Sequence, residues 1–170
     1  MSAAPPADFR ADDLLAALSA HAIQFLVVGG IGAQLHGAAR VTFDLDVCVP
    51  WSRENFKRLA EVLGGLDARL DVPPELANLE VPPTGELLAR TSMTRWHTRA
   101  GVLDVLHSIP AGAGGAPRGY AELEPRAVAI RGPGSDVLVA ALDDIIASKE
   151  HANREKDREA LPELYALRNR

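Results

Sequence analysis

The chain has 170 residues, of which 47% are hydrophobic and 24% charged, and its formal net charge is −5. This length predicts a single domain, and the composition excludes a disordered or fibrous chain. The net negative charge argues against a protein that binds nucleic acid through its overall charge. No apolar stretch approaches the ~20 residues of a membrane helix, and we expect neither a membrane span nor a signal peptide. The single cysteine, Cys48, excludes a disulfide within the chain and fits a reducing, cytoplasmic location.

The first half of the chain alternates helical and strand patterns. Residues 1–7 are rich in proline and alanine and are expected to be disordered, ahead of one domain over residues 8–170. Helix caps, apolar periodicity and glycine or proline stops predict the elements. In chain order they are a helix from Asp8, a strand over 24–28, a short helix to Gly37, a strand over 41–49, and a helix from Ser52 to Gly64.

The second half changes from strand patterns to helical ones. Residues 73–85 contain two Pro-Pro pairs and are expected to form a loop, as is the glycine-rich segment 111–119. The expected strands lie at 66–72, 92–98, 102–108, 126–131 and 136–139, and the expected helices begin at Ala141 and enclose Leu161–Leu167. This order predicts an α/β (α+β) domain in which helices flank a mixed β-sheet.

Asp44 and Asp46 are the sharpest chemical feature of the sequence. Strand side chains alternate between faces, so these two carboxylates point the same way, ~7 Å apart. They repel each other, and a half-buried strand is a costly place for both. A divalent cation such as Mg²⁺ removes that conflict, because it takes oxygen ligands and commonly binds one or two carboxylates together with substrate phosphates. Two solvent-facing aspartates on an edge strand are the alternative interpretation.

Asp104 and the Gly29-Gly30 turn add to this feature. Asp104 lies in an aliphatic strand, and it becomes a third ligand if that strand neighbours the one over 41–49. Its alternative is an acid at a strand edge. Gly29-Gly30 separates a strand from a helix start, where free amides and the absence of side chains let a phosphate approach. The alternative is a tight turn that packs the helix on the strand.

Two other phosphate-binding motifs are excluded by their spacing. The dinucleotide-binding pattern fails because Leu35 stands at its last small position. The Walker A pattern fails because the chain has no Gly-Lys-Ser/Thr sequence.

Taken together, the motifs resemble the nucleotidyltransferase superfamily of the DNA polymerase β type. The matching strings are Val27-Val28-Gly29-Gly30, Arg40-Val41-Thr42 with Asp44 and Asp46, the strand with Asp104, and the segments 142–149 and 153–157. The resemblance covers the chain from about Gln24 to Leu167. It is closest to the small bacterial branch that includes the AbiEii-like toxins.

The resemblance implies a mixed-sheet core in which Asp44, Asp46 and Asp104 surround two Mg²⁺ ions. It also implies a nucleotide site made of Gly29, Gly30, Arg40, Thr42, Lys149, Lys156 and Asp157, with the lysines facing the triphosphate. Lys149 and Lys156 are seven residues apart, which returns to nearly the same helix face and agrees with this assignment. A solvated helix end with charge pairs is the alternative interpretation.

The expected activity is Mg²⁺-dependent transfer of a nucleoside monophosphate from a nucleoside triphosphate (NTP) to a hydroxyl group of a protein, a tRNA or a small molecule. Two ions about 3.5–4 Å apart would activate the acceptor hydroxyl and neutralise the leaving pyrophosphate. Asp104 would accept the hydroxyl proton. The resemblance also implies a toxin–antitoxin role or a drug-modifying role. A small sheet with open edges favours a partner chain, such as an antitoxin, or a second copy. The alternative is an inactive module that binds a nucleotide or a partner.

Other chemically suggestive residues carry weaker hypotheses. His97 and His107 lack the spacing of a zinc site. Trp51 and Trp96 are expected in the core or at a rim rather than as base-stacking platforms. The basic residues of the middle of the chain would contact an anionic acceptor or solubilise the sheet, and they are Arg90, Arg95, Arg99 and Arg118.

Overall fold

The structure is a computed structural model and describes residues 9–170. The expected disordered segment 1–7 and the expected N-cap Asp8 lie outside the described residues. The strands are β1 (Leu26–Val28), β2 (Asp44–Cys48), β3 (Arg69–Leu70), β4 (Met93–Thr98), β5 (Gly101–Leu106), β6 (Ser108–Ile109), β7 (Arg118–Gly119), β8 (Val128–Arg131) and β9 (Asp136–Val139).

Residues 9–170 also form seven α-helices. They are α1 (Ala11–Ala20), α2 (Gly29–Leu35), α3 (Arg53–Gly65), α4 (Gly85–Arg90), α5 (Tyr120–Leu123), α6 (Leu142–Ala152) and α7 (Glu155–Arg168). Three short 3₁₀ turns complete the order at Pro74–Leu76, Ala113–Gly115 and Glu124–Arg126. Among these described helices, none is both long and apolar enough to cross a membrane.

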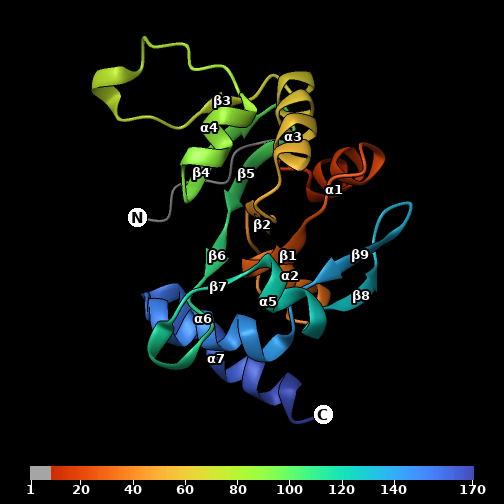
Figure 1. The fold of residues 1–170 in the computed structure, drawn as a ribbon. Helices are drawn as coiled ribbons and strands as arrows, with labels where there is room; N and C mark the ends of the chain where they lie inside the picture. The colour runs from red at the N-terminus through yellow and green to blue at the C-terminus, as the bar shows by residue number, and fades with distance from the viewer. Residues whose placement is uncertain (1–8) are drawn as a thin grey trace.

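A mixed sheet of seven strands forms the centre of the fold, with the strand order β3-β4-β5-β2-β1-β9-β8 (Figure 1). The pairs β2–β5 and β1–β9 are parallel, and the other neighbours in the sheet are antiparallel. The short pair β6–β7 forms a separate two-stranded sheet. The predicted α/β (α+β) class with a mixed sheet is therefore confirmed.

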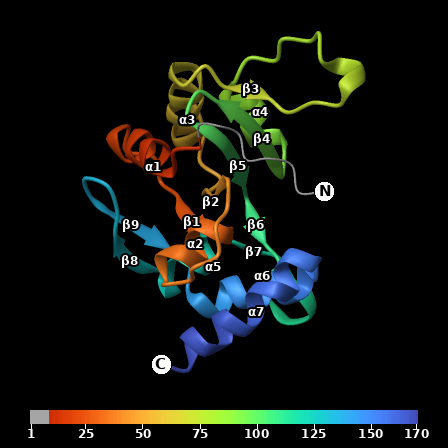
Figure 2. The same cartoon turned by 180° about the vertical axis from the view of Figure 1, so that it is seen from behind.

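The two faces of the central strands differ because strand side chains alternate. Leu45 and Val47 of β2 and Leu103 and Val105 of β5 are buried on the face that α1 contacts. Trp96 of β4 is also fully buried. In both views, α6 and α7 lie together at the end of the molecule away from α3 and α4 (Figures 1 and 2). The acidic residues of β2 and β5 alternate with these apolar residues and belong to the opposite face.

A buried acid fastens α6 to the rest of the domain. Asp144, in the first turn of α6, is 1% exposed and accepts hydrogen bonds from Arg118 at 2.8 Å and Arg126 at 2.5 Å. These arginines come from β7 and from the turn before β8. Two charge-assisted bonds on one buried carboxylate fix the orientation of the helix that carries Lys149.

Several elements differ from the sequence-based expectation. The strand expected over 66–72 is reduced to β3, because the chain first turns back on α3 through Asp67 at φ 52° and the bond from the Ala68 N–H to Leu63. The loop expected over 73–85 ends at an additional helix, α4, whose start is capped by Thr84. With only six residues, α4 is too short to show a helical period in the sequence. Another short helix, α5, follows the expected loop at 111–119.

Candidate functional site

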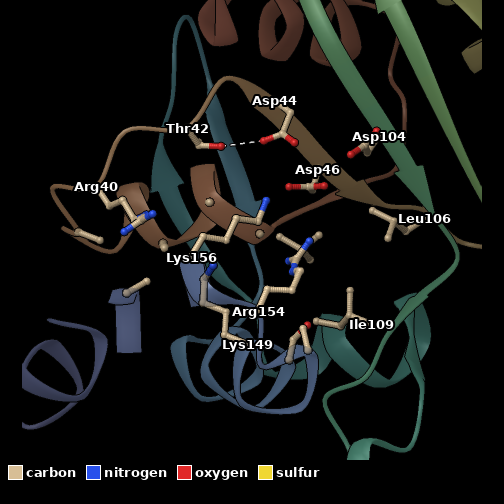
Figure 3. A pocket seen from close by; sticks show the side chains of 18 of the residues that line it. Arg40, Thr42, Asp44, Asp46, Asp104, Leu106, Ile109, Lys149, Arg154 and Lys156 are labelled. Carbon is tan, nitrogen blue, oxygen red and sulfur yellow. Dashed lines mark hydrogen bonds between the residues drawn. The ribbon is translucent and has the colours of Figure 1, made fainter. Parts of the chain in front are cut away.

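Three aspartates from two neighbouring strands meet on one face of the sheet. The parallel register of β2 and β5 places Asp46 opposite Asp104, and alternation puts Asp44 on the same side as Asp46. One carboxylate oxygen from each residue lies within 4.8 Å of the other two (Figure 3). We call Asp44, Asp46 and Asp104 the acidic triad. The structure brings together the three residues singled out in the sequence, and their role as metal ligands stays a prediction.

The crowding of these carboxylates makes full ionisation unfavourable. Burial raises the pKa of Asp46 to about 8, and the negative charges of Asp44 and Asp104 add to the rise. The ammonium group of Lys156 acts in the opposite direction. Carboxylate oxygens, which carry negative charge, are ligands that Mg²⁺ prefers. The acidic triad therefore fits a divalent cation.

Gly29 and Gly30 lie directly against the triad, where side chains would collide. A Cβ atom on Gly29 would lie 2.2 Å from Asp46 Oδ2, and the residue has a φ of +63°, which favours glycine. A Cβ atom on Gly30 would lie 2.9 Å from the side chain of Thr42. Thr42 in turn donates a hydrogen bond of 2.7 Å to Asp44 Oδ1. The glycine pair thus lets the β1–α2 turn approach the carboxylates closely.

Arg95 is the direct cationic partner of the triad. Its Nε donates to Asp104 Oδ1 at 2.8 Å, and its Nη2 donates to Asp104 Oδ2 at 2.7 Å and to Asp44 Oδ2 at 3.1 Å. The neighbouring carboxylates raise the pKa of Arg95 above its already high value. In the sequence, Arg95 is only one of several basic residues in the middle of the chain. Its place follows from the hairpin register, in which Thr98 pairs with Gly101 and counting outward sets Arg95 opposite Asp104.

A second group of cations faces the triad from α6, from α7 and from the two-residue break between these helices. Lys149, Arg154 and Lys156, which we call the cationic wall, line the same cavity as the triad (Figure 3). Lys149 is 15% exposed, and its ammonium lies 3.4 Å from the fully buried Asp157. Asp157 also accepts a 2.7 Å bond from Arg154 Nε. Asp157 therefore lies behind the cations and holds them, and it is not among the residues that line the cavity.

Arg40 lies at the opposite end of the cavity lining from Asp104 in the close view (Figure 3). It is half exposed and donates a 2.8 Å bond to Glu159 of α7. The neighbouring N–H of Ala39 donates to Glu163 at 2.8 Å. The segment before β2 is thus tied to α7 at two points.

One cavity of about 810 Å³ contains the acidic triad and the cationic wall. This volume is in the range of small-molecule sites. Leu106 and Ile109 lie on the side of Asp104 (Figure 3), and they belong to an apolar part of the lining. This apolar part consists of Met93, Val102, Leu106, Ile109 and Pro110.

The remaining candidates from the sequence lie outside this arrangement. The triad is the only group of three or more metal-ligating side chains found among residues 9–170, and it includes neither His97 nor His107. His107 stacks on Phe56 with ring centroids 5.3 Å apart. Trp96 is in the core, as expected, whereas Trp51 is 63% exposed. Cys48 is buried, and burial raises the pKa of its thiol to about 12.

Neither a protein-family model nor a curated protein matches the sequence. Among solved structures, the solution structure of the antibiotic-resistance factor ANT(2'')-Ia has a TM-score of 0.55 at 15% identity, over 92% of this chain and 85% of that chain. The crystal structure of ANT(2'')-Ia in complex with adenylyl-2''-tobramycin has a TM-score of 0.55 at 16% identity, over 92% and 91% of the two chains.

This chain shares the fold of ANT(2'')-Ia, which agrees with the predicted mixed-sheet fold class. At these identities the likeness establishes the arrangement of the elements and not the substrates. The finer resemblance to the AbiEii-like branch stays a prediction.

Proposed function

We propose that this protein transfers a nucleoside monophosphate from an NTP to a hydroxyl group of a small molecule. The observation that carries the proposal is that the acidic triad and the cationic wall line one cavity. Carboxylates at one side suit Mg²⁺, and ammonium and guanidinium groups at the other suit phosphate oxygens. The motif resemblance and the fold shared with an enzyme bound to an adenylylated aminoglycoside support the same reaction class.

In the proposed reaction, the acceptor oxygen forms a bond to the α-phosphorus, and the bond from that phosphorus to the pyrophosphate oxygen breaks. Mg²⁺ held by the acidic triad would supply positive charge at the phosphates. The hydroxyl proton passes to Asp104, which requires that Arg95 release one of the two oxygens it holds. Lys149, Arg154 and Lys156 stabilise the charge of the leaving pyrophosphate.

The other nucleotide-binding assignments extend this proposal. Gly29 and Gly30 line the cavity beside Asp46, where the lack of side chains lets the backbone of the β1–α2 turn lie against the phosphate site. Arg40 adds a positive charge to the lining, and Thr42 orients Asp44 through its hydrogen bond. Asp157 acts indirectly, because it contacts Lys149 and Arg154 from behind.

A small-molecule acceptor fits the cavity better than a macromolecule. Its volume of about 810 Å³ would hold the phosphates and one compact acceptor. The apolar lining beside Asp104 favours an acceptor that offers an apolar surface near its reacting hydroxyl. An aminoglycoside is the first acceptor to test, because ANT(2'')-Ia has been seen with adenylyl-2''-tobramycin.

The experiment is transfer of label from α-³²P-labelled ATP, CTP, GTP and UTP in the presence of Mg²⁺. Acceptors are tobramycin, a lincosamide and neutral hydroxylated compounds, and the products are separated by chromatography. We expect a labelled product with the wild type and none with Asp46→Asn. Asp71→Asn is the matched control, because Asp71 is half exposed and pairs with His97. Equal labelling by the wild type and Asp46→Asn would overturn the proposal.

A second candidate function is nucleotide binding without transfer. The hold of Arg95 on both oxygens of Asp104 favours it, because those oxygens are then not free for a cation or a proton. Equilibrium dialysis with labelled NTPs separates the two candidates. Saturable binding that Lys149→Met weakens, with no labelled product from any acceptor, would support the binding module.

A further inference from the structure

The guanidinium of Arg95 occupies the carboxylate oxygens that a divalent cation would use. It takes both oxygens of Asp104, at 2.8 and 2.7 Å, and one oxygen of Asp44, at 3.1 Å. A planar fork that binds both oxygens of a carboxylate is the strongest geometry available to an arginine. One side chain thus joins the two strands of the triad.

This contact is built into the sheet and is not a surface ion pair. Arg95 and Asp104 are directly opposite in the antiparallel β4–β5 register. The Asp104 side chain is only 2% exposed, and that of Arg95 is 39% exposed. Opposite charges at directly paired positions stabilise a sheet, and a buried carboxylate that loses its partner is costly.

We infer that Arg95 is a built-in counter-ion of the acidic triad, which holds Asp44 and Asp104 together in the cation-free protein and competes with a divalent cation for their oxygens. The inference rests on the cation site of the proposed function, but it does not require nucleotidyl transfer. A cation that binds Asp104 must draw at least one oxygen away from the guanidinium. In addition, a fixed positive charge beside the site repels the incoming cation.

The test is the affinity of the whole chain for Mn²⁺, measured by titration calorimetry without nucleotide, together with thermal unfolding. We expect Arg95→Met to bind Mn²⁺ at least tenfold more tightly than the wild type. Its unfolding temperature without metal should fall, and saturating Mn²⁺ should raise that temperature more than in the wild type. Arg95→Lys keeps the charge but loses the fork, so its affinity should lie between the two.

Two further variants make the outcome specific. Arg90→Met removes the same charge from an exposed side chain that pairs with Glu86, and it should leave Mn²⁺ affinity within twofold of the wild type. Asp46→Asn should abolish Mn²⁺ binding both alone and combined with Arg95→Met, because it removes a ligand that both proteins need.

The possible failures can be told apart. If the wild type binds Mn²⁺ and Arg95→Met binds it no more tightly, Arg95 is not a competitor and the inference is overturned while the cation site stands. If neither protein shows saturable binding, the cation site fails and the inference fails with it. If Arg95→Met does not fold, Arg95→Lys decides the question, and an affinity equal to or below that of the wild type overturns the inference.

Discussion

Asp157 and Lys149 face each other across the break between α6 and α7, with Lys149 Nζ 3.4 Å from Asp157 Oδ1. The break itself is made by Asn153, which has a left-handed φ of +48°. Burial alone would raise the pKa of Asp157, but the hydrogen bond and charge of Arg154 and the charge of Lys149 outweigh it and hold this pKa below its usual value. One buried acid therefore fixes two of the three cations that we place at the triphosphate.

Asp157→Asn should destabilise the fold, because it leaves Lys149, which is itself largely buried, without its charged partner. We expect a loss of about 3 kcal/mol in the free energy of unfolding, as is typical when one member of a buried pair is removed. Urea denaturation followed by circular dichroism measures it. Asp143→Asn is the control on α6, since Asp143 is exposed and 3.9 Å from Arg168. A loss no larger than that of the control would contradict the positioning role of Asp157.

His107 should make stability depend on pH. Its ring stacks on Phe56 at an interplanar angle of 17°, and burial lowers its pKa although a backbone hydrogen bond with Leu88 acts the other way. In the unfolded chain the group takes up a proton near its ordinary pKa of about 6.5. The unfolded state therefore binds more protons just below that pH, and stability falls as the pH falls through it.

The measurement compares urea unfolding at pH values above and below 6.5. His107→Phe keeps an aromatic ring on Phe56 but removes the titration, so its stability should fall less on acidification than that of the wild type. His21→Gln removes an exposed histidine and should keep the wild-type slope. Equal slopes for His107→Phe and the wild type would show that the ring does not contribute.

Much of the sheet could be predicted because its strands are apolar runs with clear stops. Residues 136–139 were expected as a strand and form β9 with the same bounds, and Ser52 caps α3 as expected. The strand expected over 41–49 shrinks to β2, because the segment before it leaves the sheet and bonds to α7 through Arg40 and Ala39. Contacts between residues so far apart in the chain produce no periodic pattern in the sequence from which they could be predicted.

The candidate site could be predicted in part for a similar reason. The shared face of Asp44 and Asp46 follows from alternation within one strand, which is a local property. The position of Asp104 close to this pair depends on which strands are neighbours in the sheet. Only the motif resemblance predicts that neighbourhood. The sequence alone does not single out Arg95 as a site residue, because its position opposite Asp104 depends on the register of β4 against β5. The resemblance assigns Asp157 to the nucleotide site, and in the structure its carboxylate contacts Lys149, which lines the cavity.

Gly29→Ala should damage the triad without touching its carboxylates. The new Cβ atom would lie 2.2 Å from Asp46 Oδ2, in a backbone conformation that side chains rarely adopt. We expect a destabilisation of about 2 kcal/mol from the strained φ and the clash, together with weaker Mn²⁺ binding. Denaturation and calorimetric titration measure the two effects.

Gly64→Ala is the matched control for this substitution. Gly64 lies within α3 and has no atom near the position of a Cβ. Because alanine favours a helix, this variant should be more stable by about 0.5–1 kcal/mol and should bind Mn²⁺ normally. Mn²⁺ binding by Gly29→Ala at the wild-type level would show that the close approach of the turn is not needed at the site.

Lys149→Met should weaken NTP binding more than the loss of an exposed lysine does. Lys149 is held by Asp157 and lines the cavity, so it loses little freedom when a phosphate binds. A hydrogen bond to a charged group contributes about 1.5–3 kcal/mol, which predicts a tenfold to hundredfold rise in Kd by equilibrium dialysis with a labelled NTP. Lys57→Met is the control. It removes the same charge from an exposed residue of α3 that does not line the cavity, and it should change Kd less than twofold.

The stability of Lys149→Met separates a binding role from a structural one. Because Asp157 would keep its bond to Arg154 in this variant, its free energy of unfolding should change only modestly. A large loss of stability with unchanged Kd would instead assign Lys149 a structural role and remove it from the nucleotide site.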